Sequence, residues 1–438
     1  MDLAGKKVVV VGMAKSGTAA VKLLLAKGAE VRAVDEKPQP PVLGVPVLPQ
    51  AEESFGRPDL VVISPGVPAD LAILEALRAR GIPVIGELEL AAPFLQGGNI
   101  GVTGTNGKTT TTALTGHILR EAGIASQVGG NIGTPLTAMV ETSRPDQWNV
   151  LELSSFQLET VQSFHAPIAA CLNMTQNHLD RHHTFENYVN AKARLFETQR
   201  AGDLAVLNAD DPVTAGLAKR TPAQTVWFSG THPASGAWLD QDYILLEGER
   251  LLNVRELRLR GRHNYENVMA AALIAVRVGA KRAQIAGAAA TFTPVEHRLE
   301  LVRELNGVAY YNDSKATSVD ATLKAIDAFP GGLWIILGGK DKDSDYTVLR
   351  DPLHAKARAA LLIGKAASKI ANHLGDDAVP ILLCGTLAAA VDRAYQSARP
   401  GDTVLLAPAC ASFDQFESYE HRGRVFKELV QGLAGGNA

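Results

Sequence analysis

The chain has 438 residues, a formal net charge of −3 at pH 7 and 46% hydrophobic residues. This length allows roughly two to four domains with several cores, and the charge excludes a basic surface for nucleic acid or an anionic membrane. Three scattered cysteines, Cys171, Cys384 and Cys410, exclude a zinc-type spacing and a disulfide framework and fit a reducing compartment.

The N-terminus has no signal-peptide pattern, because its first apolar run is broken by Gly12 within a few residues. No apolar stretch of the sequence reaches the length that spans a bilayer. We therefore expect a soluble, cytoplasmic protein, a monomer that neither inserts into a membrane nor binds nucleic acid.

The first segment predicts a nucleotide-binding βαβ unit. Its elements are, in order, a strand over 6–11, a glycine-rich turn over 12–17, a helix over 18–27 and a strand over 30–34. Asp35 follows the second strand at about the distance expected of a dinucleotide fingerprint. Ala14, however, replaces the middle glycine and hinders close approach to a pyrophosphate. The pattern leaves an NAD fold and a general nucleotide-binding fold equally open.

The stretch that follows Gly97-Gly98 predicts an ATP site. A short apolar run over 99–103 leads into Gly-Thr-Asn-Gly-Lys-Thr-Thr at 104–110, and a helix is expected over 111–120. Backbone N–H groups at such a helix start wrap phosphates, Lys108 reaches the terminal phosphates, and the Thr109 hydroxyl ligates magnesium. The strict motif has a glycine where this chain has Val102. An ordinary glycine turn is the weaker alternative.

Apolar runs and helical segments alternate through the rest of the chain, which predicts an α/β fold of three domains. Asp240 to Leu259 alternates like a hairpin and is expected to be a small antiparallel addition. Joints are expected at Gly97-Gly98 and near Thr291 to Pro294. The expected bounds are 1–93 for the first domain, 94–293 for the central domain and 294–438 for the last.

Two polar residues follow apolar strands of the central region. Glu152 ends the run at 148–153, and His178 follows the run at 167–172. We expect them at the tips of adjacent strands, and ligands gather at the carboxyl ends of such sheets. In a P-loop fold an acid at this place serves magnesium. The alternatives are a solvated glutamate and a structural histidine.

Lys192 lies on the apolar side of a predicted helix. Phe185, Tyr188, Val189 and Phe196 form a stripe at helical spacing, and Lys192 falls on that stripe. Such a lysine either extends its amine to solvent or is desolvated with a lowered pKa. A neutral amine near a metal could take up carbon dioxide and form a carbamate ligand.

Three later polar stretches stand at turns, at 261–267, 312–320 and 407–416. In the second, Thr317 with Asp320 fits a helix capping box, and in the third, Ser412 with Gln415 does so. Capping is compatible with anion binding, because a capped helix start still offers N–H groups.

With these motifs the chain resembles the Mur ligases of peptidoglycan synthesis nearly end to end. Gly-Thr-Asn-Gly-Lys-Thr at 104–109 is the phosphate loop of that family, which accounts for Val102. The stretches 152–159, 312–317 and 408–416 are similar to the branch that adds D-glutamate to UDP-N-acetylmuramoyl-L-alanine. Asn177 and Tyr419 depart from its pattern, which has an acid and a phenylalanine there.

The resemblance implies a Rossmann-like N-terminal domain for the UDP substrate, a P-loop ATPase-type central domain for ATP and Mg²⁺, and a Rossmann-like C-terminal domain for the amino acid. It implies Lys108, His178 and Lys192 as catalytic residues, Lys192 being carbamylated. The implied metal ligands are Thr109, Glu152, His178 and Lys192. The implied nucleotide contacts are Gly104, Thr105, Asn106, Gly107, Lys108, Thr109, Thr110, Asn264, Asn267, Arg298 and Asp313.

The resemblance also implies the substrate contacts. Those for the UDP-sugar substrate are Lys15, Ser16, Asp35, Glu36, Asn131 and Ser154, with Asp35 and Glu36 near the uracil. Those around the D-glutamate pocket are Lys315, Thr317, Lys342, Ser412 and Phe413.

The expected activity is ATP-dependent ligation through an acyl phosphate. A sister ligase for another amino acid, such as a folylpolyglutamate synthase, lacks the N-terminal UDP domain and is disfavoured. An NAD-linked oxidoreductase leaves the phosphate loop unexplained. A nucleotide-controlled scaffold without catalytic activity is a third alternative.

Overall fold

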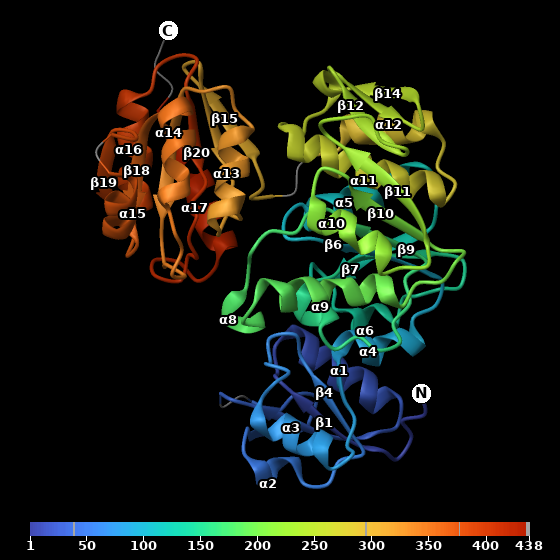
Figure 1. Cartoon of the computed structure of the whole chain (residues 1–438). Helices are drawn as coiled ribbons and strands as arrows, with labels where there is room; N and C mark the ends of the chain where they lie inside the picture. Colours follow the sequence, from blue (N-terminus) through green and yellow to red (C-terminus); the bar gives the residue numbers. More distant parts are fainter. Residues whose placement is uncertain (38–39, 294–295, 376, 435–438) are drawn as a thin grey trace. The chain divides into compact units, whose positions relative to one another are not determined.

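The computed structural model describes residues 1–37, 40–293, 296–375 and 377–434. The chain divides into two compact units (Figure 1). The first contains Met1–Leu257 and Tyr265–Phe292, and the second contains Arg258–Asn264 and Thr293–Ala438. Three separate sheets, each with helices, confirm the α/β fold. Pro294, at the second expected boundary, lies outside the described residues.

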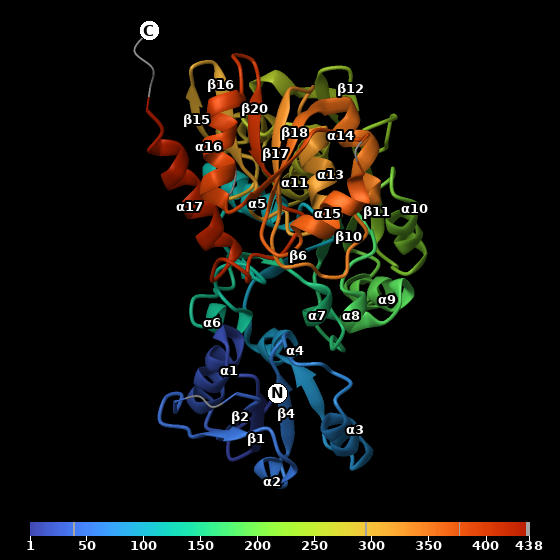
Figure 2. The ribbon, with the colours of Figure 1, turned by 90° about the vertical axis from the view of Figure 1, so that its left-hand side faces the viewer.

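The N-terminal sheet has five parallel strands in the order β3-β2-β1-β4-β5. Their bounds are β1 Lys7–Val11, β2 Glu30–Asp35, β3 Val47–Pro49, β4 Leu60–Ile63 and β5 Val84–Gly86. The valines of β1 are buried because helices cover both faces of the sheet, α1 (Lys15–Ala26) on one face and α3 (Ala72–Ala79) on the other (Figure 2). The helix α1 begins three residues before its expected start.

A glycine is required in the first turn of α1, at position 17. A Cβ at Gly17 would collide with the carbonyl oxygen of Gly12, which itself has a φ of +88°. Ser64 at the end of β4 donates to the same carbonyl over 2.6 Å. The turn is therefore held tightly at the carboxyl end of this sheet.

The central sheet has nine strands in the order β14-β13-β12-β11-β10-β9-β6-β8-β7. Its strands are β6 Gly98–Thr103, β7 Ser126–Gly130, β8 Trp148–Glu152, β9 Ile168–Cys171, β10 Leu204–Asn208, β11 Gln224–Ser229, β12 Ala237–Asp240, β13 Tyr243–Leu246 and β14 Glu249–Asn253. The pairs among strands β6 to β12 are all parallel, whereas β13 pairs antiparallel with both β12 and β14. The expected hairpin is thus confirmed.

Helices connect and cover the central strands. The long ones are α5 Lys108–Glu121, α9 Phe185–Glu197, α11 Arg262–Arg277 and α12 Arg282–Thr291. The short ones are α4 Glu87–Ala91, α6 Leu136–Met139, α7 Ser155–Leu158, α8 Leu179–His182 and α10 Pro212–Gly216. Strand β6 lies between β8 and β9, so the expectation that Glu152 and His178 follow adjacent strands was wrong. The parallel crossovers place the strand of the phosphate loop between the other two.

The last sheet has six strands in the order β15-β16-β20-β17-β18-β19. Its strands are β15 Glu300–Leu305, β16 Val308–Asn312, β17 Leu333–Gly338, β18 Ala357–Ile363, β19 Ile381–Gly385 and β20 Thr403–Leu406. Only β15 pairs antiparallel.

Two groups of helices bury the faces of this last sheet in separate apolar cores (Figure 2). One core holds α13 Val319–Asp327, α14 Arg350–Lys356 and α15 Ala367–Leu374. The other holds α16 Leu387–Ser397 and α17 Tyr419–Gln431. Across the described part of the chain, the helices are too short or too polar to cross a bilayer.

Candidate active site

The phosphate loop leaves the carboxyl end of β6 and opens into α5. Gly104 and Gly107 have φ values of +139° and +84°, which favour glycine strongly. The Nζ atom of Lys108 folds back and donates to the carbonyl oxygens of Gly104 and Thr105 over 3.0 and 2.9 Å. The side chain of Asn267 lies close to Gly107, where a Cβ would collide with it. The loop therefore has the curled shape of an anion site at a helix start.

Glu152 ends β8 beside this loop and is only 2% exposed. Its Oε1 atom accepts a hydrogen bond from Asn131 Nδ2 over 2.8 Å. Its Oε2 atom is buried and has no hydrogen-bond partner among the described residues. A buried carboxylate oxygen without a donor is costly, so the donor set fits a cation such as Mg²⁺, which prefers oxygen ligands.

Lys192 is buried, with 1% of its surface exposed, so its amine does not extend to solvent. Its Nζ atom donates to the Gly104 carbonyl over 2.9 Å and to Thr103 Oγ1 over 3.2 Å. Burial holds the pKa of this amine well below its usual range, and the charge of nearby Lys108 lowers that pKa further, whereas Cys171 and Glu152 oppose the shift. Burial thus makes the neutral form of Lys192 easier to reach than that of an exposed lysine.

His178 directly precedes α8 and has a positive φ of 54°. Its ring packs edge-on against Phe156, with ring centroids 4.7 Å apart. Because Phe156 belongs to α7, which follows Glu152 closely in the chain, this contact brings His178 towards the end of β8. Lys108, Glu152 and Lys192 therefore lie around the carboxyl ends of β6 and β8, and the contact with Phe156 places His178 beside the short helix that follows β8.

Several of the residues expected to hold the UDP-sugar substrate also make hydrogen bonds that stabilise the turns and helix starts around them. The Asp35 carboxylate accepts the N–H groups of Met13 and Lys37 over 2.6 and 2.9 Å, which ties β2 to the turn before α1. Lys15 and Ser16 open α1, and Glu36 is exposed. The backbone N–H of Asn131 donates to the Glu152 carbonyl. Ser154 caps α7 in a reciprocal capping box with Gln157.

The second unit holds the other expected nucleotide residues except Asn267. Asp313 is 1% exposed, and Arg298 Nη1 donates to its Oδ1 over 3.3 Å. Burial raises the pKa of Asp313, and the Arg298 charge opposes that rise. Asn264 is buried and donates from Nδ2 to the Arg260 carbonyl over 2.7 Å.

The residues expected around D-glutamate also lie in the second unit. Lys342 Nζ donates to the Thr317 carbonyl over 3.2 Å, so these two residues are brought together. Lys315 Nζ lies 5.7 Å from the centre of the Tyr419 ring. Ser412 is buried, whereas Phe413 is 67% exposed. Among these residues, Lys342 and Phe413 are the exposed ones.

Both expected capping boxes of this unit were wrong. Ser318, and not Thr317, caps α13, because its side chain accepts the N–H of Ala321 over 3.3 Å. The residues after Ser412 form turns in which its carbonyl accepts the N–H groups of Gln415 and Phe416. The side chains of Thr317 and Ser412 therefore do not begin helices.

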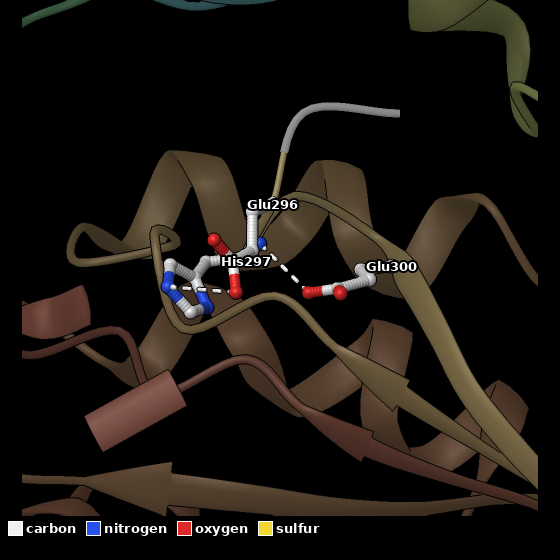
Figure 3. A group of neighbouring side chains, drawn as sticks. All are labelled: Glu296, His297 and Glu300. Carbon is white, nitrogen blue, oxygen red and sulfur yellow. Dashed lines mark hydrogen bonds and ion pairs between the residues drawn. The ribbon is translucent and has the colours of Figure 1, made fainter. Parts of the chain in front are cut away.

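Glu296, His297 and Glu300 form the group of three potential metal ligands found among the described residues (Figure 3). Lys427 Nζ already lies 2.9 Å from Glu296 Oε1 and 2.6 Å from Glu300 Oε1. Asn312 Nδ2 donates to His297 Nδ1, which in the neutral ring leaves the proton on Nε2. A lysine therefore supplies the cation, and the group is an ion-pair network.

Three residues that support the loops of the two units were not predicted from the sequence. Asn173 binds the backbone of the phosphate loop, and the Tyr188 hydroxyl lies 2.9 Å from Thr105 Oγ1. Arg422 is fully buried and donates to Ser314 and to the Cys410 carbonyl. The only signal for Arg422 was its spacing on the apolar face of α17, four residues before Phe426.

Three protein-family domains match most of the chain. Residues 6–86 match the Mur ligase MurD-like N-terminal domain, residues 102–275 the Mur ligase middle domain, and residues 297–410 the Mur ligase glutamate ligase domain. These matches fall in turn on the three sheets, which places three Mur ligase domains along the chain.

Full-length relatives give the same result. The chain is 61% identical over 439 residues to a UDP-N-acetylmuramoylalanine--D-glutamate ligase from Solibacter usitatus, covering 99% of both chains. It is 50% identical to the Koribacter versatilis protein of that name, again over 99% of each. Among solved structures it resembles MurF from Thermotoga maritima in complex with ADP, with 16% identity, a TM-score of 0.63 and coverage of 99% and 97%. It also resembles the UDP-N-acetylmuramate-alanine ligase MurC from the same organism, with 19% identity, a TM-score of 0.64, and coverage of 97% of this chain and 99% of the MurC chain.

Proposed function

The chain belongs to the Mur ligase family, and from this premise we propose that it is the ATP-dependent ligase that joins D-glutamate to UDP-N-acetylmuramoyl-L-alanine for cell-wall synthesis. The name of its 61% identical relative supports the substrate pair. The observation that carries the reaction type is the grouping of Lys108, Glu152 and Lys192 around one phosphate loop.

The reaction would run in two steps. An oxygen of the substrate's L-alanine carboxylate attacks the γ-phosphorus of ATP, the bond from that phosphorus to the β-bridging oxygen breaks, and ADP leaves. The amine of D-glutamate then attacks the acyl phosphate carbonyl, a tetrahedral intermediate forms, and inorganic phosphate leaves as the amine loses a proton. Both reactants of the first step are anions, so Lys108 and the start of α5 would stabilise and align them.

Magnesium, held by Thr109, Glu152 and His178, would neutralise charge on the phosphates. The unpartnered Glu152 oxygen supports this ligand set. Lys192, whose pKa is lowered by burial and which bonds to the phosphate loop, would form a carbamate with carbon dioxide, and the resulting anion would be a further ligand. We propose Lys315 and Lys342 as the cationic partners of the D-glutamate carboxylates, near Thr317, Ser412 and Phe413.

We further propose the domain bounds 1–93, 94–293 and 294–438 and a division of labour among them. The first would hold the UDP end through Lys15, Ser16, Asp35 and Glu36, and the second would hold ATP and the sugar side through Asn131 and Ser154. Asn264, Asn267, Arg298 and Asp313 would complete the nucleotide site. We propose a monomer in the cytoplasm, where ATP and UDP-sugars are available.

Phosphate release with both substrates, with each alone and with neither tests this proposal. We expect release only when ATP, UDP-N-acetylmuramoyl-L-alanine and D-glutamate are all present. Release that is independent of the two acceptors would favour a nucleotide-controlled scaffold, and a preference for another amino acid would favour a sister ligase. Oxidation of NADH, followed by its absorbance, would favour the oxidoreductase.

A further inference from the structure

Asn173 makes three hydrogen bonds with the backbone of the phosphate loop. It follows β9 and is partly buried beside the loop that leaves β6. Its backbone carbonyl accepts the Thr105 N–H over 2.8 Å, and its side-chain Oδ1 accepts the Asn106 N–H over 2.8 Å. Its Nδ2 donates to the Asn106 carbonyl over 3.1 Å.

These three bonds hold three successive peptide groups. The Thr105 N–H belongs to the peptide between residues 104 and 105, the Asn106 N–H to the next peptide, and the Asn106 carbonyl to the one after that. A loop rich in glycine has many accessible backbone conformations, and a hydrogen bond to a peptide group restricts the rotation of that group. One residue thus restricts the loop from Gly104 to Gly107.

The two residues after Asn173 are held as well. The Met174 N–H donates to Asp211 Oδ2 over 2.7 Å. The Thr105 hydroxyl accepts the Thr175 N–H over 2.9 Å and donates to the Thr175 carbonyl over 3.1 Å, so the nearby Tyr188 hydroxyl is the donor in its own contact with Thr105. Residues 173–175, which we call the clasp, are therefore fixed to the loop at two points.

We propose that the clasp sets the phosphate loop in its nucleotide-binding shape and that Asn173 is its positioning residue. The N–H groups of Thr105 and Asn106 are directed at Asn173, so the phosphates are left to the N–H groups at the start of α5. The same short segment leads to His178, so the loop and the candidate metal ligand share one support. This inference rests on the proposed function, because it needs a nucleotide at this loop.

Binding of Mg²⁺-ADP to the full chain, measured by calorimetry, tests the proposal. Asn173→Leu keeps the side-chain volume and removes both side-chain hydrogen bonds, and Asn173→Ser is a second variant in case leucine disturbs folding. We expect each to weaken ADP binding about tenfold, the effect of losing one to two such bonds. Binding of UDP-N-acetylmuramoyl-L-alanine should change less than twofold.

Asn208→Leu is the matched control. Asn208 is also a buried amide beside β9. Its Nδ2 donates to the Leu172 carbonyl and its Oδ1 accepts the Asp210 N–H, each over 2.9 Å, so these bonds go to residues outside the phosphate loop. It should leave ADP binding within twofold of the wild type. Unchanged ADP binding by both Asn173 variants, equal weakening of both ligands, or equal weakening by Asn208→Leu would overturn the positioning role. Failure of the wild-type chain to bind ADP would instead overturn the proposed function.

Discussion

Replacing Arg422 should loosen the two loops that hold the expected D-glutamate residues. Its Nε and Nη2 atoms donate to Ser314 Oγ and to the Ser314 carbonyl over 2.9 and 2.8 Å, and Nη1 donates to the Cys410 carbonyl over 3.2 Å. Burial lowers the pKa of Arg422 only to about 10, so it is charged at pH 7. One buried cation thus ties residues 312–317 to residues 408–413.

Arg422→Met keeps most of the side-chain volume and removes all three bonds. Charge-assisted hydrogen bonds contribute about 1.5–3 kcal/mol each to stability. The variant also avoids the cost of desolvating the guanidinium, about several kcal/mol, which offsets part of that loss. We therefore expect the free energy of unfolding of the second unit to fall by about 2–5 kcal/mol. Amide hydrogen exchange, read by mass spectrometry on peptides from 312–317 and 408–413, should accelerate.

Arg424 provides the control, since it is exposed on the same helix two residues away. Arg424→Met should change the free energy of unfolding by less than about 0.5 kcal/mol and leave both peptides protected. Equal exchange in the Arg422 and Arg424 variants, or a loss of stability below about 1 kcal/mol for Arg422→Met, would refute the reasoning.

The remaining predictions concern the first unit. Lys108→Ala should lower kcat by about 10²–10³-fold. Normal turnover in this variant would show that Lys108 has no catalytic role. Lys192→Ala should lose activity that formate or acetate partly restores, whereas loss without any rescue would argue against a carbamate. Burial raises the pKa of Glu87, although the N–H and hydroxyl of Thr137 both donate to its Oε1. The carboxyl group of Glu87 therefore stays protonated to higher pH in the folded protein than in the unfolded chain. The protein should lose stability as pH rises above the ordinary pKa range of glutamate. In urea unfolding, Glu87→Gln should therefore gain stability relative to the wild type between pH 5 and pH 8, and a constant difference would contradict this.

The local elements were predictable because they depend on local pattern. The apolar run at 6–11 predicted β1 to within one residue, and the Gly-Lys-Thr-Thr turn at 107–110 predicted α5, which begins at Lys108, three residues before its expected start at 111. The apolar stripe correctly predicted that Lys192 lies on the buried side of α9. Its burial in the structure then excluded the alternative in which the amine extends to solvent.

The order of strands was not predictable in the same way. Sequence neighbours β8 and β9 are separated by β6, because parallel crossovers choose the pairing and leave no local signal. Asn173 and Arg422 were missed for a related reason. Asn173 bonds to Asn106, 67 residues away in the chain, and Arg422 bonds to Ser314, 108 residues away. From the sequence, an asparagine or arginine near the end of a helix or strand is equally consistent with an exposed surface residue. Thr317 and Ser318 are both residue types preferred at an N-cap, and the acid at 320 wrongly favoured Thr317 over Ser318.

The most direct test of the account follows the oxygen that the first step transfers. UDP-N-acetylmuramoyl-L-alanine labelled with ¹⁸O in the alanine carboxylate is incubated with the chain, ATP, Mg²⁺ and D-glutamate, and the released phosphate is analysed by mass spectrometry. Ligation through an acyl phosphate predicts one labelled oxygen in each phosphate released. Phosphate without the label would contradict the mechanism, even if the dipeptide product formed.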